Sequence, residues 1–148
     1  MTKNRFKLVP AVAIILKKDN EILLHKRKNT GYADEQWAYV GGGVDGNETI
    51  RQAAVREVKE EVGVTIHEED INVVHVKHAK GTAGTKYPEE YLIFYLEAEV
   101  WNGNLQIMEP DKCDELKWFD LDNLPENLLS KHIIQLIQDG KIYSEQGW

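Results

Sequence analysis

One segment, residues 41–64, constrains this chain more than any other part of its sequence. It starts with glycines and continues into a predicted helix over Thr49–Val62, which Gly63 ends. At about 100° per residue, the helix has an apolar stripe on one side and three carboxylates on the opposite side. The stripe is Val55, Val58 and Val62, the carboxylates are Glu57, Glu60 and Glu61, and Ala53 and Ala54 flank the carboxylates. The segment therefore predicts a helix that packs on a core and keeps an acidic face accessible.

The three carboxylates have two interpretations. Acidic faces are common on solvated surface helices, but such helices usually place lysine four residues from glutamate, whereas here Glu57 faces Glu61. A divalent cation among the carboxylates relieves their repulsion, and Mg²⁺ prefers oxygen ligands and commonly bridges to substrate phosphates. We therefore predict a Mg²⁺ site, which Mn²⁺ can also fill. The neighbouring alanines are expected to keep the approach to the cation open.

The spacing of this segment resembles the Nudix box, G-x5-E-x7-R-E-U-x-E-E-x-G-U, in which U is a bulky aliphatic residue. Every specified position between residues 42 and 64 matches: Gly42, Glu48, Arg56, Glu57, Val58, Glu60, Glu61, Gly63 and Val64. Nine defined positions rarely agree by chance, so the surface-helix interpretation loses most of its weight. The first strand pair, the W-x-x-x-G-G-G stretch at Trp37–Gly43 and the L-x-x-L-P stretch at Leu121–Pro125 also look like small MutT-like members of this family.

The resemblance implies a fold, a reaction and a set of site residues. The fold is an α/β/α sandwich around a mixed, curved sheet that contains antiparallel strands, and the reaction is hydrolysis of a nucleoside diphosphate linked to another moiety. The implied metal ligands are Glu57, Glu60, Glu61 and the carbonyl of Gly41. Arg56 is expected to orient the box carboxylates, which makes Arg56, Glu57, Glu60 and Glu61 the candidate catalytic residues. Glu48 is expected to support the junction of loop and helix.

The remaining sequence predicts several strands and a second helix within one domain over residues 1–148. Glycines 41–43 and the Asp45-Gly46-Asn47 stretch predict a loop, and Ser130 is the expected cap of the last helix. The expected strands are 9–17, 21–28, 71–78, 91–101 and 116–119, with the first two forming a hairpin, and the last helix carries Ile133, Ile134, Leu136 and Ile137. Strands and helices mixed in a domain of this size favour an α/β sandwich.

Charge and composition exclude several classes of protein. The 148 residues carry a formal net charge of −7, with 42% hydrophobic and 29% charged residues, which is typical of a globular domain. The acidity argues against a nucleic-acid polymer as partner, although residues 1–41 hold eight basic and only four acidic side chains. No apolar run is long enough to span a membrane, and Cys113 is the only cysteine. We therefore expect a cytoplasmic protein, and the resemblance implies a small nucleotide as its partner and a monomer or homodimer.

Candidate site residues also lie outside the box. The proton of the attacking water is expected to go to Glu60 or Glu61, or to Glu109 or Glu115, which are also candidate metal ligands. Lys26 and Arg27 lie near the end of the strand expected at 21–28, where alternation sends their basic side chains to opposite faces, so at least one of them is expected to contact a phosphate. Tyr39 and Tyr87 are the candidates for contact with a base.

Three functions remain open from the sequence. The first is Mg²⁺-dependent hydrolysis of a nucleoside triphosphate, with a standard or an oxidised base, to a monophosphate and pyrophosphate. The second keeps the chemistry but takes ADP-ribose, a dinucleotide cofactor or a dinucleoside polyphosphate as substrate. The third is a Nudix-like module that binds a nucleotide without turnover, against which the intact box argues. The sequence favours the first of these, as a nucleotide pyrophosphohydrolase acting on acid anhydrides of phosphorus.

Overall fold

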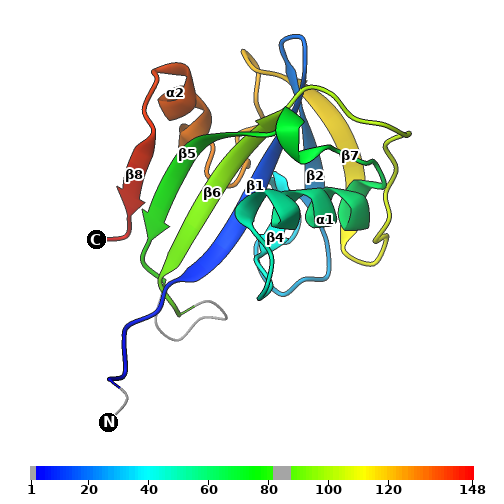
Figure 1. The fold of residues 1–148 in the computed structure, drawn as a ribbon. Helices are drawn as coiled ribbons and strands as arrows, with labels where there is room; N and C mark the ends of the chain where they lie inside the picture. The colour runs from blue at the N-terminus through cyan, green and yellow to red at the C-terminus, as the bar shows by residue number, and fades with distance from the viewer. Residues whose placement is uncertain (1–2, 82–87) are drawn as a thin grey trace.

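The computed structural model describes residues 3–81 and 88–148, and it shows a curved mixed sheet with a helix on each face (Figure 1). The strands of the described residues are β1 (Val9–Lys18), β2 (Glu21–Arg27), β3 (Trp37–Ala38), β4 (Val40–Gly43), β5 (Asn72–Ala79), β6 (Tyr91–Ala98), β7 (Cys113–Asp120) and β8 (Tyr143–Gln146). The helices are α1 (Ile50–Val62) and α2 (His132–Gln138), with a 3₁₀ turn at Glu68–Asp70. This arrangement confirms the predicted α/β/α sandwich.

Strand β1 lies at the centre of the sheet. It pairs antiparallel with β2 and β4 and parallel with β6, so the first hairpin is confirmed and the sheet is mixed. The order of neighbours is β3-β2-β1-β6-β5-β8, while β7 pairs with β2 on a separate branch. The parallel register of β1 and β6 runs from Val9 opposite Tyr91 to Leu16 opposite Ala98.

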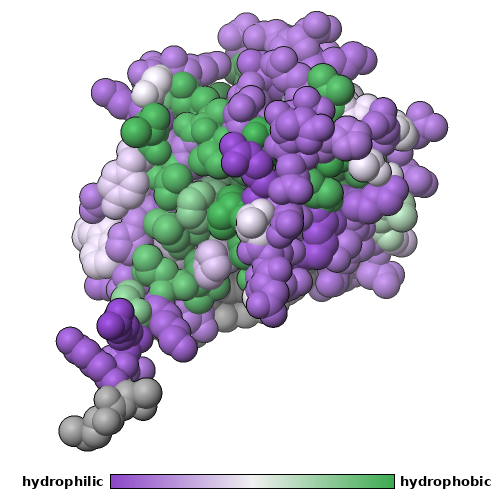
Figure 2. Space-filling view, viewed as in Figure 1, coloured by the Kyte–Doolittle hydropathy of each residue, from purple (hydrophilic) through white to green (hydrophobic). Residues whose placement is uncertain are grey.

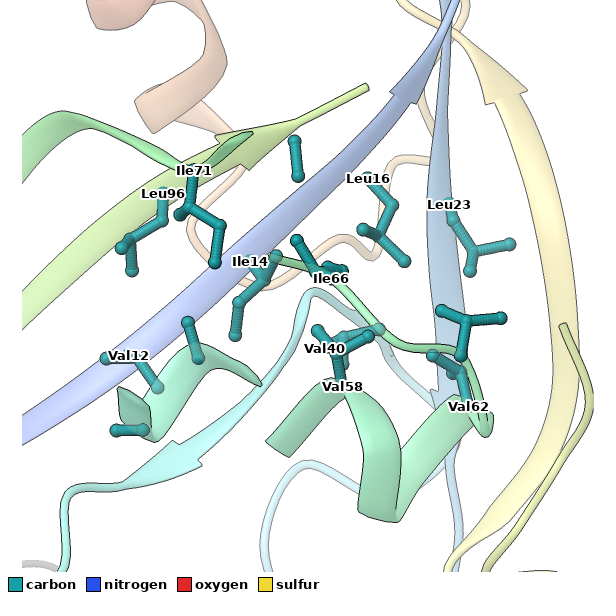
Figure 3. Close-up of a cluster of buried hydrophobic side chains, with 14 residues drawn as sticks. Val12, Ile14, Leu16, Leu23, Val40, Val58, Val62, Ile66, Ile71 and Leu96 are labelled. Atoms are coloured by element: carbon teal, nitrogen blue, oxygen red, sulfur yellow. The ribbon is translucent and has the colours of Figure 1, made fainter. Parts of the chain in front are cut away.

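Both faces of β1 are buried, and this explains its unbroken apolar sequence. Val12, Ile14 and Leu16 belong to the core on the α1 side, which is drawn in Figure 3, whereas Ile15 belongs to a second core on the α2 side. The second core also contains Ile133 of α2. Because successive side chains of a strand point to opposite faces, one strand supports both helical layers.

Helix α1 begins and ends where the sequence predicts. Thr49 caps its N-terminus in a reciprocal capping box with Gln52, and Gly63 ends it in the left-handed conformation with φ of 78°. The prediction that Ala53 and Ala54 keep a ligand's approach open is wrong, because both side chains are fully buried in the core on the α1 side. Their small side chains instead let the helix approach the sheet closely, so the glutamates on the helix also lie near the sheet.

Two other predictions about secondary structure are wrong, and one strand was not predicted. Residues 41–43 form part of β4 rather than a loop, because they pair with residues 11–13 of β1. Ser130 does not cap α2, whose N-cap is Lys131 without a side-chain bond; its hydroxyl instead accepts a hydrogen bond from Lys77 at 2.8 Å. Strand β8 was not expected from its polar sequence, and it pairs parallel to β5.

The surface of the α1 face is divided between two kinds of side chain. Figure 2 shows hydrophilic side chains over α1 and apolar ones gathered beside it, over β5 and β6. The half-buried Val76, Leu92 and Phe94 come from these two strands. In the part of the chain that the structure describes, no helix has the length and apolar character needed to cross a membrane.

Candidate active site

The site is built where α1 lies against β4, and one glycine sets how closely they approach. A Cβ atom added at Gly42 would lie 2.5 Å from one carboxylate oxygen of Glu57, closer than real Cβ contacts. Glu57 is buried and occupies the space above this glycine. The first fixed position of the box, Gly42, therefore has a steric reason, because only glycine leaves room for the carboxylate that follows 15 residues later.

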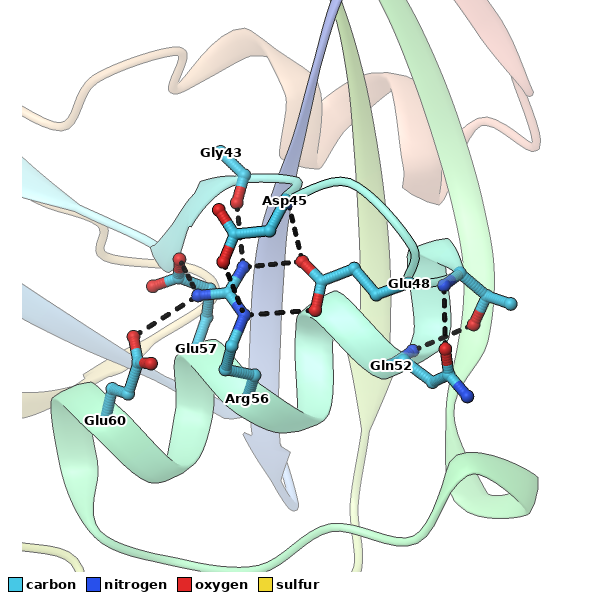
Figure 4. Close-up of polar contacts among 8 residues, drawn as sticks. Gly43, Asp45, Glu48, Gln52, Arg56, Glu57 and Glu60 are labelled. Carbon is cyan, nitrogen blue, oxygen red and sulfur yellow. Dashed lines mark hydrogen bonds and ion pairs between the residues drawn. The ribbon is translucent and has the colours of Figure 1, made fainter.

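Arg56 joins the loop, β4 and α1 into one network (Figure 4). Its guanidinium binds Glu48 through two hydrogen bonds, 2.7 and 3.1 Å long, and donates to the carbonyl of Gly43 at 3.0 Å. Its Nη1 donates to Glu57 at 2.9 Å and to Glu60 at 3.3 Å. A planar guanidinium with five donors suits this geometry, whereas a lysine could not reproduce it.

The charges of this network perturb the groups in it. The hydrogen bonds of Arg56 and of the Asp45 N–H hold the pKa of Glu48 below its usual range. The hydrogen bond to Glu48, followed by that to Glu57, raises the pKa of Arg56. Arg56 is therefore a permanent cation that fixes the direction of the carboxylates, which agrees with the orienting role expected for it.

Glu57, which is buried, and Glu61, which is half-buried, form the less exposed part of the acidic face. Burial raises the pKa of Glu57 despite the guanidinium of Arg56, and the nearby Glu60 raises it further. Burial also raises the pKa of Glu61 well above its usual range, and repulsion from Glu57 adds to this. Glu61 accepts a hydrogen bond from the N–H of Gly41 at 3.3 Å, while Glu60 is exposed to solvent. Two carboxylates are thus held in a poorly solvated place where their charges repel.

His25 on β2 faces this pair from the sheet and was missed from the sequence. Its Nδ1 atom lies 3.6 Å from Glu61 Oε2, and the imidazole is buried. Burial, followed by the charge of Arg27, lowers the pKa of His25 to about 4, so the ring is neutral near pH 7 and forms no ion pair with Glu61. The available signal was strand alternation, which puts His25 on the same face of β2 as Leu23 and Arg27.

A cavity of about 290 Å³ opens beside Glu61. Its lining comes from β2, the loop after it, α1, the segment leading into β7 and β7 itself: His25, Arg27, Asn29, Thr30, Glu61, Glu109, Lys112, Cys113 and Leu116. The structure therefore brings Glu109 to the same cavity as Glu61, although 48 positions separate them in the chain. Glu115 is exposed on β7 opposite Lys26 and is not part of the lining.

The four predicted substrate contacts lie in different places. Arg27 lines the cavity, whereas Lys26 points to the other face of β2 and pairs with Glu35 at 3.5 Å. Tyr39 is buried in the core on the α2 side, where its hydroxyl donates to the carbonyl of Ser130 at 3.2 Å. Tyr87 lies outside the described residues. Of these four side chains, Arg27 is the one that the structure places beside the carboxylates.

The chemistry of the acidic face fits a divalent cation. Within residues 3–81 and 88–148, no three acidic, histidine or cysteine side chains already form a complete metal site, since Glu57 and Glu60 are directed to Arg56. The donors are nevertheless hard carboxylate oxygens, and burial together with mutual repulsion disfavours their charged forms. A dication relieves both effects, because it neutralises the pair without a proton.

The Gly41 carbonyl is oriented to join these donors. The Gly41 N–H points away from β1 to Glu61, and two residues later the Gly43 carbonyl points to Arg56. In an antiparallel strand the N–H and C=O of one residue lie on the same side, and this side repeats every second residue. The Gly41 carbonyl therefore faces the edge of β4 that borders α1.

The chain is similar in sequence to several known hydrolases. The chain is 34% identical to the ADP-ribose pyrophosphatase of Methanocaldococcus jannaschii over 85% of its own length and 71% of that protein. It is 33% identical to the CTP pyrophosphohydrolase of Escherichia coli over 64% of its length and 76% of that protein. It also matches the NAD-capped RNA hydrolase NudC of Stutzerimonas stutzeri at 25% identity, but spans only 44% of that longer protein.

Solved structures of Nudix and MutT proteins are similar to this chain. The MutT NUDIX hydrolase from Burkholderia pseudomallei superposes with a TM-score of 0.77 at 27% identity, over 91% of this chain and 98% of that one. The MutT protein from Bacillus halodurans shares the fold, with a TM-score of 0.74 at 20% identity over 94% and 90% of the two chains. The family model described as the NUDIX domain matches residues 7–139, which include the whole acidic segment. The chain belongs to the Nudix hydrolase family.

Proposed function

We propose that this protein hydrolyses a pyrophosphate bond of a small nucleotide with the help of a divalent cation, Mg²⁺ or Mn²⁺. The observation that carries the proposal is the carboxylate pair of the buried Glu57 and the half-buried Glu61, with Glu61 and Arg27 in the wall of one cavity. The carboxylates suit a cation and the guanidinium suits a phosphate, so one cavity combines both requirements for attack of water on phosphorus.

The proposed roles follow from the positions of the side chains. Glu57, Glu60, Glu61 and the Gly41 carbonyl would hold the cation, which when bound neutralises phosphate charge and lowers the pKa of water. Arg56 orients Glu57 and Glu60 through its hydrogen bonds, and Glu48 fixes Arg56 in turn. A carboxylate accepts the proton of the attacking water.

Candidates for this proton acceptor differ in their exposure to the cavity. Glu61 and Glu109 line it, whereas Glu60 lies on the solvent side of α1. Separate Gln substitutions at the three positions distinguish them, because loss of the acceptor lowers kcat at saturating metal, whereas loss of a ligand alone is overcome in part by a higher metal concentration.

The preferred substrate is a nucleoside triphosphate, with a standard or an oxidised base. Attack of water then yields a nucleoside monophosphate and pyrophosphate. The 33% identity to a CTP pyrophosphohydrolase and the similarity to structures of MutT proteins support this choice. The net charge of −7 favours small nucleotides over a nucleic-acid polymer, whose many phosphates it would repel.

ADP-ribose is the second candidate, because the relative with 34% identity over most of the chain is an ADP-ribose pyrophosphatase. Attack of water on either phosphorus of ADP-ribose yields AMP and ribose 5-phosphate. The products therefore separate the two candidates: pyrophosphate appears only with a triphosphate cleaved between the α and β phosphorus atoms. Dinucleotide cofactors and dinucleoside polyphosphates belong in the same test.

The test is a panel of these nucleotides with Mg²⁺ or Mn²⁺ in ¹⁸O-labelled water, followed by mass analysis of the products. The expected result is a monophosphate from at least one nucleotide, with the label on the phosphorus that water attacks. Binding of a nucleotide without any turnover across the panel would instead support the module without catalysis. The same purified protein, passed over a sizing column with light scattering, distinguishes monomer from homodimer, and a single cooperative transition in urea unfolding supports the proposed single domain.

A further inference from the structure

The loop between β2 and β3, residues 28–36, has an unusual backbone. Four of its residues adopt positive φ angles between 51° and 77°: Asn29, Gly31, Ala33 and Glu35. Side chains other than glycine rarely adopt this conformation, and such residues persist only where surrounding contacts hold them. The loop therefore has a source of order that offsets this strain.

Backbone hydrogen bonds across the base of the loop supply part of that order, and Asp34 supplies the rest at its tip. Its carboxylate accepts hydrogen bonds from the backbone N–H of Thr30 at 3.0 Å and of Gly31 at 3.1 Å. It also accepts the hydroxyl proton of Thr30, with a distance of 2.7 Å between the oxygens. These bonds, the hydroxyl one above all, lower the pKa of Asp34, so it is charged near pH 7. One carboxylate thus closes the loop around Thr30.

The closed loop holds Arg27. Its Nη2 donates to the Thr30 hydroxyl at 3.0 Å, its Nε donates to the Tyr32 carbonyl at 2.9 Å, and its guanidinium lies 5.5 Å from the centre of the Tyr32 ring. The Thr30 hydroxyl has one proton and two acceptors within reach, the Asp34 carboxylate at 2.7 Å and the Tyr32 carbonyl at 2.8 Å. The charged carboxylate is the stronger acceptor, so the proton points to Asp34, and the lone pairs accept from Arg27 and from the Tyr32 N–H at 3.2 Å. Asp34, Thr30 and Arg27 therefore form a chain of hydrogen bonds that ends at the cavity wall.

We propose that Asp34 and Thr30 are positioning residues for phosphate binding, because they fix the Arg27 guanidinium at the cavity wall before substrate arrives. The proposal rests on the proposed function, in which a substrate phosphate binds Arg27. Without the contacts from the loop, phosphate binding would have to order the long, flexible Arg27 side chain, and this entropy cost would weaken the affinity for phosphate. A released guanidinium would also be free to pair with Glu61 or Glu109, which line the same cavity.

A matched pair of variants tests the role of the Thr30 hydroxyl. Thr30→Val keeps the shape and removes the hydroxyl, whereas Thr30→Ser keeps the hydroxyl. The probe is inorganic pyrophosphate with Mg²⁺, measured by titration calorimetry, because its binding needs no turnover. We expect Thr30→Val to raise the Kd about tenfold and Thr30→Ser to change it less than threefold. For a nucleotide that turns over, Thr30→Val should raise KM by a similar factor and leave kcat within about twofold.

A double-mutant cycle separates positioning from mere support of the loop. If Thr30 acts through Arg27, Thr30→Val should have no further effect on the Kd in the Arg27→Ala background. Asp34→Asn should behave like Thr30→Val, because it weakens the same chain. Mn²⁺ affinity, followed by the electron spin resonance of free Mn²⁺, should stay unchanged in both, since neither residue belongs to the acidic face.

The outcomes are decisive in both directions. Equal Kd values for wild type and Thr30→Val, additive effects of Thr30→Val and Arg27→Ala, or absence of pyrophosphate binding to the wild type would each overturn the proposal. Absence of turnover across the nucleotide panel would overturn the proposed function alone, because the pyrophosphate titration still compares the variants. Thermal unfolding of each variant identifies any that fails to fold, and Asp34→Asn then replaces Thr30→Val in the cycle.

Discussion

The contact between Gly42 and Glu57 allows a test of the site with one methyl group. Substitution Gly42→Ala places a Cβ 2.5 Å from one oxygen of Glu57 and 2.7 Å from its carboxyl carbon. Ordinary contacts of this kind are 3.4 Å or longer, so the carboxylate has to move by about 1 Å. The atoms it meets belong to the end of a flexible side chain rather than to the backbone, so we expect the fold to be retained.

The cost follows from what Glu57 loses when it moves. Its 2.9 Å bond to Arg56 is broken or lengthened, and a hydrogen bond between charged groups contributes about 1.5–3 kcal/mol. The lower entropy of the unfolded alanine chain returns about 0.4–1 kcal/mol, which leaves a net destabilisation of about 1–2 kcal/mol. A displacement of about 1 Å at a catalytic centre lowers rates about 10²-fold. We therefore expect kcat/KM to fall by about that factor, with weaker Mn²⁺ binding.

Gly43→Ala is the matched control, because a Cβ at Gly43 would meet no atom within 4 Å. The assay compares kcat/KM, Mn²⁺ affinity and urea unfolding for both variants and the wild type. Activity and Mn²⁺ affinity like the wild type in Gly42→Ala would refute the argument that the position of Glu57 matters. An equal loss of activity and Mn²⁺ affinity in Gly43→Ala would show that any side chain in β4 impairs the site, whether or not it displaces Glu57.

Three further predictions concern the acidic face, the buried lysine and ligand binding. Glu60→Gln should lower turnover by at least about 10²-fold with unchanged circular dichroism, while the exposed Glu68→Gln should not; normal rates for Glu60→Gln would exclude Glu60 from the mechanism. Burial lowers the pKa of Lys77 from 10.5 to about 8, so between these values the unfolded chain binds more protons and stability rises with pH. Urea unfolding should show the wild type gaining up to about 3 kcal/mol relative to Lys77→Met between pH 8 and 10.5, and parallel curves would contradict this. Mg²⁺ with a substrate at about 100 times its Kd should stabilise the fold by about 2.7 kcal/mol in thermal unfolding, and an unchanged Tm across the panel would count against the site.

Local signals explain what could be predicted from the sequence. The helix Ile50–Val62 was predictable because its cap, its apolar stripe and its final glycine are all close in sequence. The first hairpin was predictable for the same reason, since Asp19 and Asn20 join two apolar runs. The grouping of the glutamates on one face of the helix was also predictable, because helical periodicity alone fixes the angle of each side chain around the helix axis.

Neighbours across the fold explain what could not be predicted. Helical angles put Ala53 near the carboxylates, but only the position of the sheet shows that this side of the helix is buried. The meeting of Glu109 with Glu61 depends on the path of the chain between β6 and β7, for which the sequence has no local signal. Strand β8 forms because a parallel neighbour is already in place, so its own pattern is weak.

The parallel pairing of β1 with β6 has a consequence for how the molecule assembles. Val9 lies opposite Tyr91, so this contact closes a loop of more than half the chain before it stabilises anything. Pairings over such distances slow folding, and a chain emerging from the ribosome can pair β1 with β2 and β4 well before β6 is synthesised. The acidic helix therefore acquires its strand support early, whereas the cavity wall that carries Glu109 is added late.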